Sequence, residues 1–264
     1  MSAMKKGKFI LIIPLGILVL LVLLYFGRNV LIRPIVELTV KSVTGLPLKI
    51  KELNIGADLS TIEIKNLEIY SPAGYHATRM AYLPEIFLSC DLGGFLKGQS
   101  HIREIRLNLQ EFEVVKNEQG KLNIEYLKPV REEQAKSQEK PAEAEPPPRK
   151  PQEFQIDVLV LGLGKVLYKD YSKGSRLEMK EYNLNINERF EGVKDLKSVT
   201  NLVVFRALTK TTIASLTNFN LKGLKNQLTE SIVSLPRGVL DGAIDTLKKT
   251  TESLKGIFTG SSKE

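Results

Sequence analysis

The chain has 264 residues, with 38 Lys and Arg against 30 Asp and Glu, and a formal net charge of +8 at pH 7. Its basic residues are spread along the chain and form no aromatic-interleaved patch, so we expect no nucleic-acid partner and a mild attraction to anionic membrane surfaces. Cys90 is the only cysteine, which excludes an intramolecular disulfide and a thiolate metal cluster.

The first element in chain order is an uncharged apolar run from Phe9 to Gly27, FILIIPLGILVLLVLLYFG. About 20 apolar residues cross a bilayer as a helix, and the run does not end in the small residues of a signal-peptide cleavage site. Residues 1–27 are therefore predicted to form a cytoplasmic tail and a transmembrane signal anchor. The span includes Phe9, Ile10, Leu18, Leu23 and Phe26.

The charges on either side of this run predict its orientation. Lys5, Lys6 and Lys8 precede it, whereas only Arg28 and Arg33 follow closely. The positive-inside rule then places the N-terminus in the cytoplasm and the remaining chain outside it. The chain has no N-x-S/T sequon, which favours a bacterial inner membrane with a periplasmic C-terminal domain over a eukaryotic secretory lumen.

A juxtamembrane helix is predicted over residues 28–46, ended by Gly45 and followed by Pro47. Beyond it, apolar residues occupy every second position of short segments, which predicts strands with one apolar face. Tight turns between these segments predict an antiparallel meander over residues 47–130, because parallel neighbours need long crossovers. The segments are Leu48–Ile55, Ile62–Ile69, Ile86–Leu92, Ile102–Leu109, Phe112–Val115 and Leu122–Tyr126.

The composition then changes twice. Residues 131–153 contain no aromatic or β-branched residue and are rich in Pro, Glu, Lys and Gln, which predicts a disordered linker. Strands resume in a second predicted meander over residues 154–206, where Gly162 and Gly164 favour a turn or bulge over a phosphate loop. Apolar residues recur every three or four positions within residues 207–264, which predicts amphipathic helices that pack on the sheet or lie at a membrane interface.

Residues with catalytic potential are sparse. His76 and His101 are the only histidines, and neither has the spacing of a metal or catalytic site. No nucleophile elbow, Walker loop or EF-hand loop occurs in the sequence. We therefore expect no enzymatic activity, no metal and no cofactor, and we expect Cys90 to be a buried strand residue.

Three segments carry a resemblance to a known family: LSTIEIKNLEIYSPAGY (59–75), YLPEIFLSCDLGGFLKGQSHIREIRLNLQEFEVVKNEQGKLNIEYL (82–127) and GKVLYKDYSKGSRLEMKEYNLNI (164–186). Together with the preceding span and the helix ending in TGLP, they resemble the AsmA-like family of bacterial envelope proteins. The resemblance implies a sheet curved into an open trough with an apolar interior. It also implies anchoring in the inner membrane, a periplasmic location, and a role in phospholipid movement and envelope integrity.

The predicted fold is thus mainly β, with an N-terminal transmembrane helix, an antiparallel meander curved into an open apolar trough, and C-terminal amphipathic helices. One face of the strands is expected to line the trough, although a bulge could shift the phase of any single strand. The residues expected to line it are Ile62, Ile64, Ile86, Leu88, Ile105, Leu107, Leu109, Val166 and Tyr168.

Two hypotheses for function follow from this trough. The leading one is a lipid-binding or lipid-moving protein whose partners are membrane lipids, other envelope proteins, or a second copy that lengthens the groove. The alternative is a non-enzymatic anchored scaffold that closes over its own core and organises envelope partners. The two hypotheses differ in whether the inward side chains leave room for a ligand.

Overall fold

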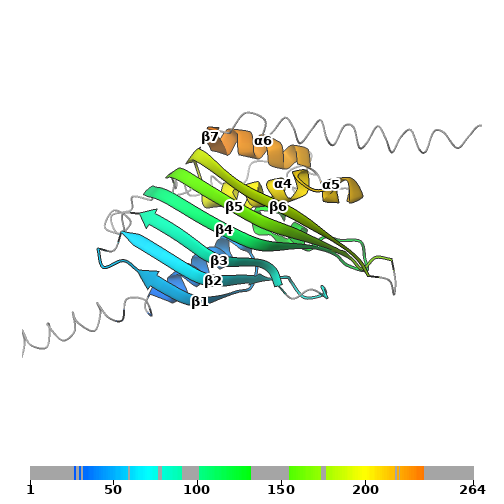
Figure 1. Cartoon of the computed structure of the whole chain (residues 1–264), viewed down its shortest axis with the longest axis horizontal. Coiled ribbons are helices and arrows are strands. Elements are labelled where there is room, and N and C mark those ends of the chain that lie inside the picture. Colours follow the sequence, from blue (N-terminus) through cyan, green and yellow to red (C-terminus); the bar gives the residue numbers. More distant parts are fainter. Residues whose placement is uncertain are drawn as a thin grey trace, which may run out of the picture.

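The computed structural model describes residues 27, 30, 32–58, 60–76, 79–90, 101–131, 155–173, 177–217, 219 and 221–234. Their strands form one seven-stranded sheet in chain order, and the sheet is open (Figure 1). The strands are β1 (Leu48–Ile55), β2 (Thr61–Tyr70), β3 (Arg79–Cys90), β4 (His101–Lys116), β5 (Gln155–Asp170), β6 (Glu178–Val193) and β7 (Ile232–Ser234). The main helices are one over residues 32–44, η1 (Asn123–Tyr126), α4 (Leu196–Thr209), α5 (Ile213–Leu216) and α6 (Leu221–Ser231). The mainly β, open architecture confirms that part of the predicted fold.

One strand pair departs from the predicted antiparallel meander. β4 and β5 run parallel, with Ile105 opposite Leu159 and Leu109 opposite Leu163. The other neighbouring strands of the described sheet are antiparallel. Residues 117–154 separate β4 from β5, and a connection of this length allows the chain to return and start a parallel strand.

Three predicted strand segments also differ from the structure. The segments at Ile102–Leu109 and Phe112–Val115 are one strand, β4, and the segment at Leu122–Tyr126 forms a single bridge at Leu122 followed by η1. The end of the predicted second meander is helical: it forms α4. Asp195 is the N-cap of this helix, and its side chain accepts a hydrogen bond from the Ser198 backbone N–H. Its β-branched residues favour a strand locally, but burial against the sheet selects the helix.

The predicted transmembrane segment, Phe9 to Gly27, precedes the described sheet in the chain. Among the described residues, no helix is long and apolar enough to span a bilayer. The predicted span residues Phe9, Ile10, Leu18, Leu23 and Phe26 lie outside the described residues. Residues 132–154 of the linker region and residues 235–264 also lie outside them.

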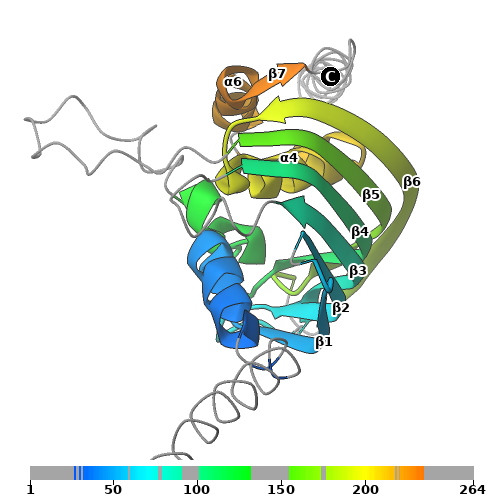
Figure 2. The ribbon, with the colours of Figure 1, turned by 90° about the vertical axis from the view of Figure 1, so that its left-hand side faces the viewer.

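The sheet is strongly curved (Figure 2), and a line of pairing irregularities crosses its strands. In β2 the residues that face the concave side change from one parity to the other at this line: they are Ile62 and Ile64 before it, and Leu67 and Ile69 after it. We call this line the crease. It passes through positions that are skipped in the pairing registers, or that lie at a register shift, in six strands. These positions are Lys51, Asn66, Pro84, Gln110, Gly164 and Asn185.

Residue types along the crease suit its backbone. Asn66 and Asn185 have positive φ angles of 52° and 48°, which asparagine tolerates better than most residues. Pro84 lacks a ladder donor, which is acceptable at a bulge. A Cβ on Gly164 would lie 2.7 Å from the Gln110 carbonyl oxygen, so this position requires glycine. Because interruptions of the hydrogen-bond ladder let strands bend and twist locally, their alignment across the sheet fits its concave shape.

Helix 32–44 and α4 lie against the concave face (Figure 2). Helix 32–44 ends at Gly45, whose φ is +75° and whose N–H donates to the Lys41 carbonyl at 2.8 Å. At the other end, Arg33 pairs with Glu37 at 3.0 Å and donates to the Ile50 carbonyl of β1. This contact attaches the helix to the edge strand. α4 packs on β5 and β6, and α6 packs on α4.

Candidate functional site

The concave face holds a partly open apolar cavity of about 500 Å³. Strands β2, β3 and β4 form its floor, and helix 32–44 and α4 form its walls. The strand residues include Ile62, Ile64, Leu67, Ile69, Met80, Ala81, Leu83, Ile86, Leu88, Cys90, Ile102, Ile105, Leu107, Leu109 and Phe112. We refer to this part of the molecule as the cavity half.

The cavity lining carries no charged side chain among the described residues. Its only hydroxyl groups are those of Thr39, Thr44 and Thr200. Two of them are already engaged within helix 32–44, because Thr39 donates to the Ile35 carbonyl at 2.8 Å and Thr44 donates to the Val40 carbonyl at 2.9 Å. A water needs two to four polar partners, so this lining suits an apolar ligand better than ordered water.

The helical walls share an unusual residue choice. Eleven of the twelve wall residues are β-branched, and the other is Leu196. The β-branched residues are Ile32, Ile35, Val36, Thr39, Val40, Val43 and Thr44 on helix 32–44, and Val199, Thr200, Val203 and Val204 on α4. Such side chains are short and stiff at χ1, so they form a firm wall that does not reach across the space in front of it.

The rest of the concave face, which we call the filled half, is packed solid. There α4 turns larger side chains, Leu202, Phe205 and Leu208, away from the cavity. They are buried together with strand residues such as Leu161 and Phe190. A buried ion pair between Arg206 of α4 and Glu188 of β6 also lies in this half.

The structure places seven of the nine predicted groove residues in the cavity lining: Ile62, Ile64, Ile86, Leu88, Ile105, Leu107 and Leu109. The other two are in a different place. Val166 and Tyr168 share the concave face but lie beyond the crease in the closed core. The Tyr168 hydroxyl donates to Asp170 at 3.1 Å, and burial raises the pKa of this phenol.

Asp170 is itself a buried carboxylate of this core. Burial alone would raise its pKa, but two hydrogen bonds from Ser172, at 2.8 Å and 2.6 Å, favour the charged form. The Lys116 ammonium, 3.6 Å away, adds to their effect. The net result is a lowered pKa for Asp170. Tyr168 and Asp170, in the quoted segment 164–186, therefore have a structural role at this end of β5.

Sequence reasoning missed the helical walls. The stripe Ile32, Val36, Val40, Val43 has helical spacing on one face and could have identified helix 32–44 as a wall. For α4 the corresponding residues, Val199 and Val203, lie four apart, but they were assigned to a strand.

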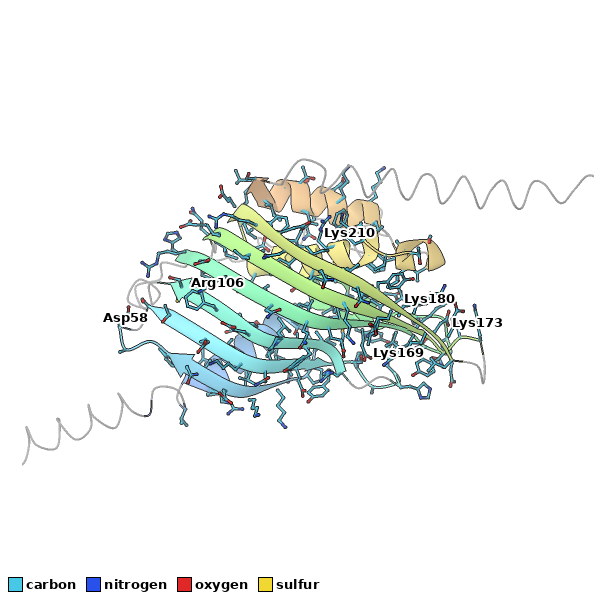
Figure 3. The ribbon with its side chains drawn as sticks, viewed as in Figure 1. Asp58, Arg106, Lys169, Lys173, Lys180 and Lys210 are labelled. Carbon is cyan, nitrogen blue, oxygen red and sulfur yellow. The ribbon has the colours of Figure 1, made fainter. Side chains whose placement is uncertain are left out.

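The convex face differs completely from the lining. An ion-pair ladder crosses it, in which Glu111 contacts Arg79 at 2.9 Å and Lys165 at 3.2 Å. Burial alone would raise the pKa of Glu111, but these two cations lower it overall. Side chains such as Arg106 and Lys169 also lie on this face (Figure 3). The polarity of the two faces therefore directs an apolar ligand to the concave one.

Both histidines are exposed and have one aromatic or acidic neighbour each. His76 stacks on Tyr171 with ring centroids 4.6 Å apart, and His101 contacts Asp157 at 2.8 Å. The described residues contain no group of three or more His, Cys, Asp or Glu side chains placed to hold a metal. Cys90 is buried and is one of the residues that line the cavity.

An open curved sheet with an apolar cavity under two helices defines a class of proteins built to present an apolar concave surface. The sequence model of the AsmA family matches residues 4–241, which is most of the chain. The chain therefore belongs to the AsmA family, which associates it with the bacterial envelope. Comparison with curated proteins and with solved structures finds no match.

Proposed function

We propose that this protein is a non-enzymatic, inner-membrane-anchored periplasmic protein that binds lipid acyl chains and supports the integrity of the envelope. The observation that carries this proposal is the cavity of about 500 Å³, whose described lining has no charge. Membership of a family associated with the envelope supports a setting in which lipid is abundant.

The lining of the cavity supports an occupant. Without a ligand, this apolar lining would face water. A bound apolar chain covers it and contributes about 0.8 kcal/mol for each methylene group that leaves water.

Helix 32–44 supports access from a bilayer. It follows the predicted anchor directly in the chain, and its outer side carries Ile35 and Leu38, which are 62% and 68% exposed, with the 76% exposed Val30 just before it. Ile35 also lines the cavity, so the exposed apolar surface is continuous with the site. A membrane surface beside this helix would cover these side chains and let an acyl chain enter without crossing water.

The lipid content of the purified protein tests the proposal. The full chain in mild detergent is extracted and its lipid measured by mass spectrometry, for the native protein, Leu107→Asp and Asn108→Asp. Leu107 lines the cavity, whereas its neighbour Asn108 is exposed and outside that lining, so the second variant controls for added charge and for lipid around the anchor. We expect Leu107→Asp alone to lose lipid. Equal lipid in all three proteins contradicts the proposal.

The location is tested separately. A reporter that is active only in the periplasm, fused after Glu264, should be active because Lys5, Lys6 and Lys8 favour a cytoplasmic N-terminus. Activity of a cytoplasmic reporter in the same position, with a silent periplasmic one, would reverse the orientation.

A scaffold function is the second candidate, and one observation favours it. Within the described residues, β7 pairs only with Glu191 and Val193, so most of the outer edge of β6 has no strand beside it. An exposed edge of this length is a template for a strand from another chain. Crosslinking from a cysteine placed at Asn183 should capture a partner if this edge is used, and capture none if the edge stays free.

A further inference from the structure

We infer that the cavity holds a single acyl chain, so that its preferred ligand is a single-chain lipid such as a fatty acid or a lysophospholipid. This inference rests on the proposed function and specifies its ligand. The volume of the cavity, its length and the stiffness of its walls carry this inference.

The volume sets the number of carbons. An engineered apolar cavity of about 150 Å³ binds benzene, which is roughly 25 Å³ for each carbon. A cavity of about 500 Å³ therefore holds about 20 carbons on the same scale. A space for about 20 carbons accommodates one long acyl chain and not two.

The length of the cavity agrees with one chain lying along the strands. On β2 the lining extends from Ile62 to Ile69, which is roughly 23 Å at about 3.3 Å per residue. One leaflet of the hydrocarbon core is about 15 Å thick. A single chain can thus lie extended along the floor, whereas a second chain would need added width.

The walls oppose widening. β-branched side chains on both helices have few rotamers, so they cannot move aside as Leu or Met would. Helix 32–44 is attached to β1 by the Arg33 contact at its N-terminal end, and at its C-terminal end the chain continues through the buried Leu46 into β1. At one end of the floor, Phe112 and Leu127 line the cavity and are packed against the buried core. A diacyl lipid would leave its second chain outside.

Saturation binding measures how many acyl chains each protein molecule binds. Delipidated full-length protein is titrated with a spin-labelled fatty acid and, separately, with a phospholipid that carries a spin label on either chain. We expect the immobilised signal of the fatty acid to saturate at one per protein. With the phospholipid, we expect weaker binding and at most one immobilised chain.

A variant that fills the cavity tests the volume argument. Ala81 is the smallest side chain of the strand floor, so Ala81→Leu adds three carbons to the lining. The preferred fatty acid in a competition series should become shorter by about three carbons. Ser89→Leu, on the same strand but outside the cavity lining, should leave the preference unchanged. Melting temperatures show that both variants are folded.

The outcomes distinguish the single-chain inference from the proposed lipid binding. Two immobilised chains per protein, or an unchanged chain preference in a folded Ala81→Leu protein, overturns the single-chain inference and leaves lipid binding intact. Absence of any saturable binding of either lipid overturns both.

Discussion

The two halves of the concave face are built from the same sheet, yet only one is filled. Beneath helix 32–44, strands β2–β4 border an apolar cavity, whereas β5 and β6 lie under α4 in a core that fully buries side chains such as Leu161 and Phe190. Helix α4 borders both halves and shows the cause of the difference. Toward the cavity it presents Val199 and Val203, and toward the filled half it presents Leu202 and Phe205.

This comparison teaches that a cavity can be specified by side-chain shape as much as by backbone spacing. Leucine and phenylalanine extend farther from a helix and fill the space beside it. Valine, isoleucine and threonine stop short, and their stiffness keeps them there. These residues lower helix propensity slightly. Both helices carry these residues where they border the cavity, despite the lowered helix propensity. This choice is consistent with a cavity that has a function.

A buried charge gives the largest expected difference between the halves. Leu161 is fully buried in the filled half, so Leu161→Asp should cost more than about 4 kcal/mol and abolish folding. Leu107→Asp places the same charge on the partly open cavity, where water can hydrate it, and the protein should accumulate at near-normal levels. Yield and thermal melting of the two variants measure this. Equal loss in both would mean that the cavity half is a closed core.

The Arg206–Glu188 pair gives the next largest effect, because it lies in the filled half. Replacing Arg206 by Met leaves the Glu188 carboxylate in a buried setting, and we expect a loss of about 3–5 kcal/mol in denaturant unfolding. The double variant Arg206→Met with Glu188→Leu should recover most of this loss. A double variant as unstable as the single one would contradict the role of the unpaired charge.

Opposite signs are expected when leucine is introduced into each half from the same helix. Val203→Leu extends into the cavity and should stabilise the delipidated protein by about 0.8 kcal/mol, the value of one buried methylene. Ala207→Leu overpacks the filled half and should destabilise by about 1–3 kcal/mol. Chemical denaturation of the two proteins supplies the comparison, and destabilisation by both would remove the distinction.

The smallest effect concerns pH in the filled half. Because the pKa of Asp170 is lowered in the folded state, its carboxylate contributes stability above its unfolded pKa, and this contribution is lost as the pH falls through the folded value. Asp170→Asn should therefore be less stable than the native protein at neutral pH, and the difference should shrink in acid. Melting curves between pH 7 and pH 3 test this; a constant difference would assign the effect to packing.

The parts of the fold that could be predicted are those with local signals. Alternation in residues 48–55 and 62–69 located β1 and β2, and seven of nine groove residues line one cavity. Gly45 and Pro47 marked the end of the helix that became a cavity wall. Each of these depends on neighbours within a few positions in the chain.

The parts that could not be predicted depend on distant contacts. The parallel pairing of β4 with β5 requires a return of the chain through residues 117–154, which no short pattern encodes. The run VTNLVVF in α4 has β-branched residues that favour a strand, and only its packing on β5 and β6 makes it a helix. Val166 and Tyr168 were placed on the correct face, but the filled half covers them.

The crease has a consequence for how such proteins can be found by their sequences. On β2 and β3, residues that face the hollow follow each other at intervals of two, three and two, as in Ile62, Ile64, Leu67 and Ile69, and again in Ala81, Leu83, Ile86 and Leu88. Neither a strand period nor a helix period describes this rhythm, so a search for regular periodicity underestimates it. A search for the same 2-3-2 interval in successive segments would select proteins whose neighbouring strands bend at the same line. The interval of three would identify the residues at which each strand bends.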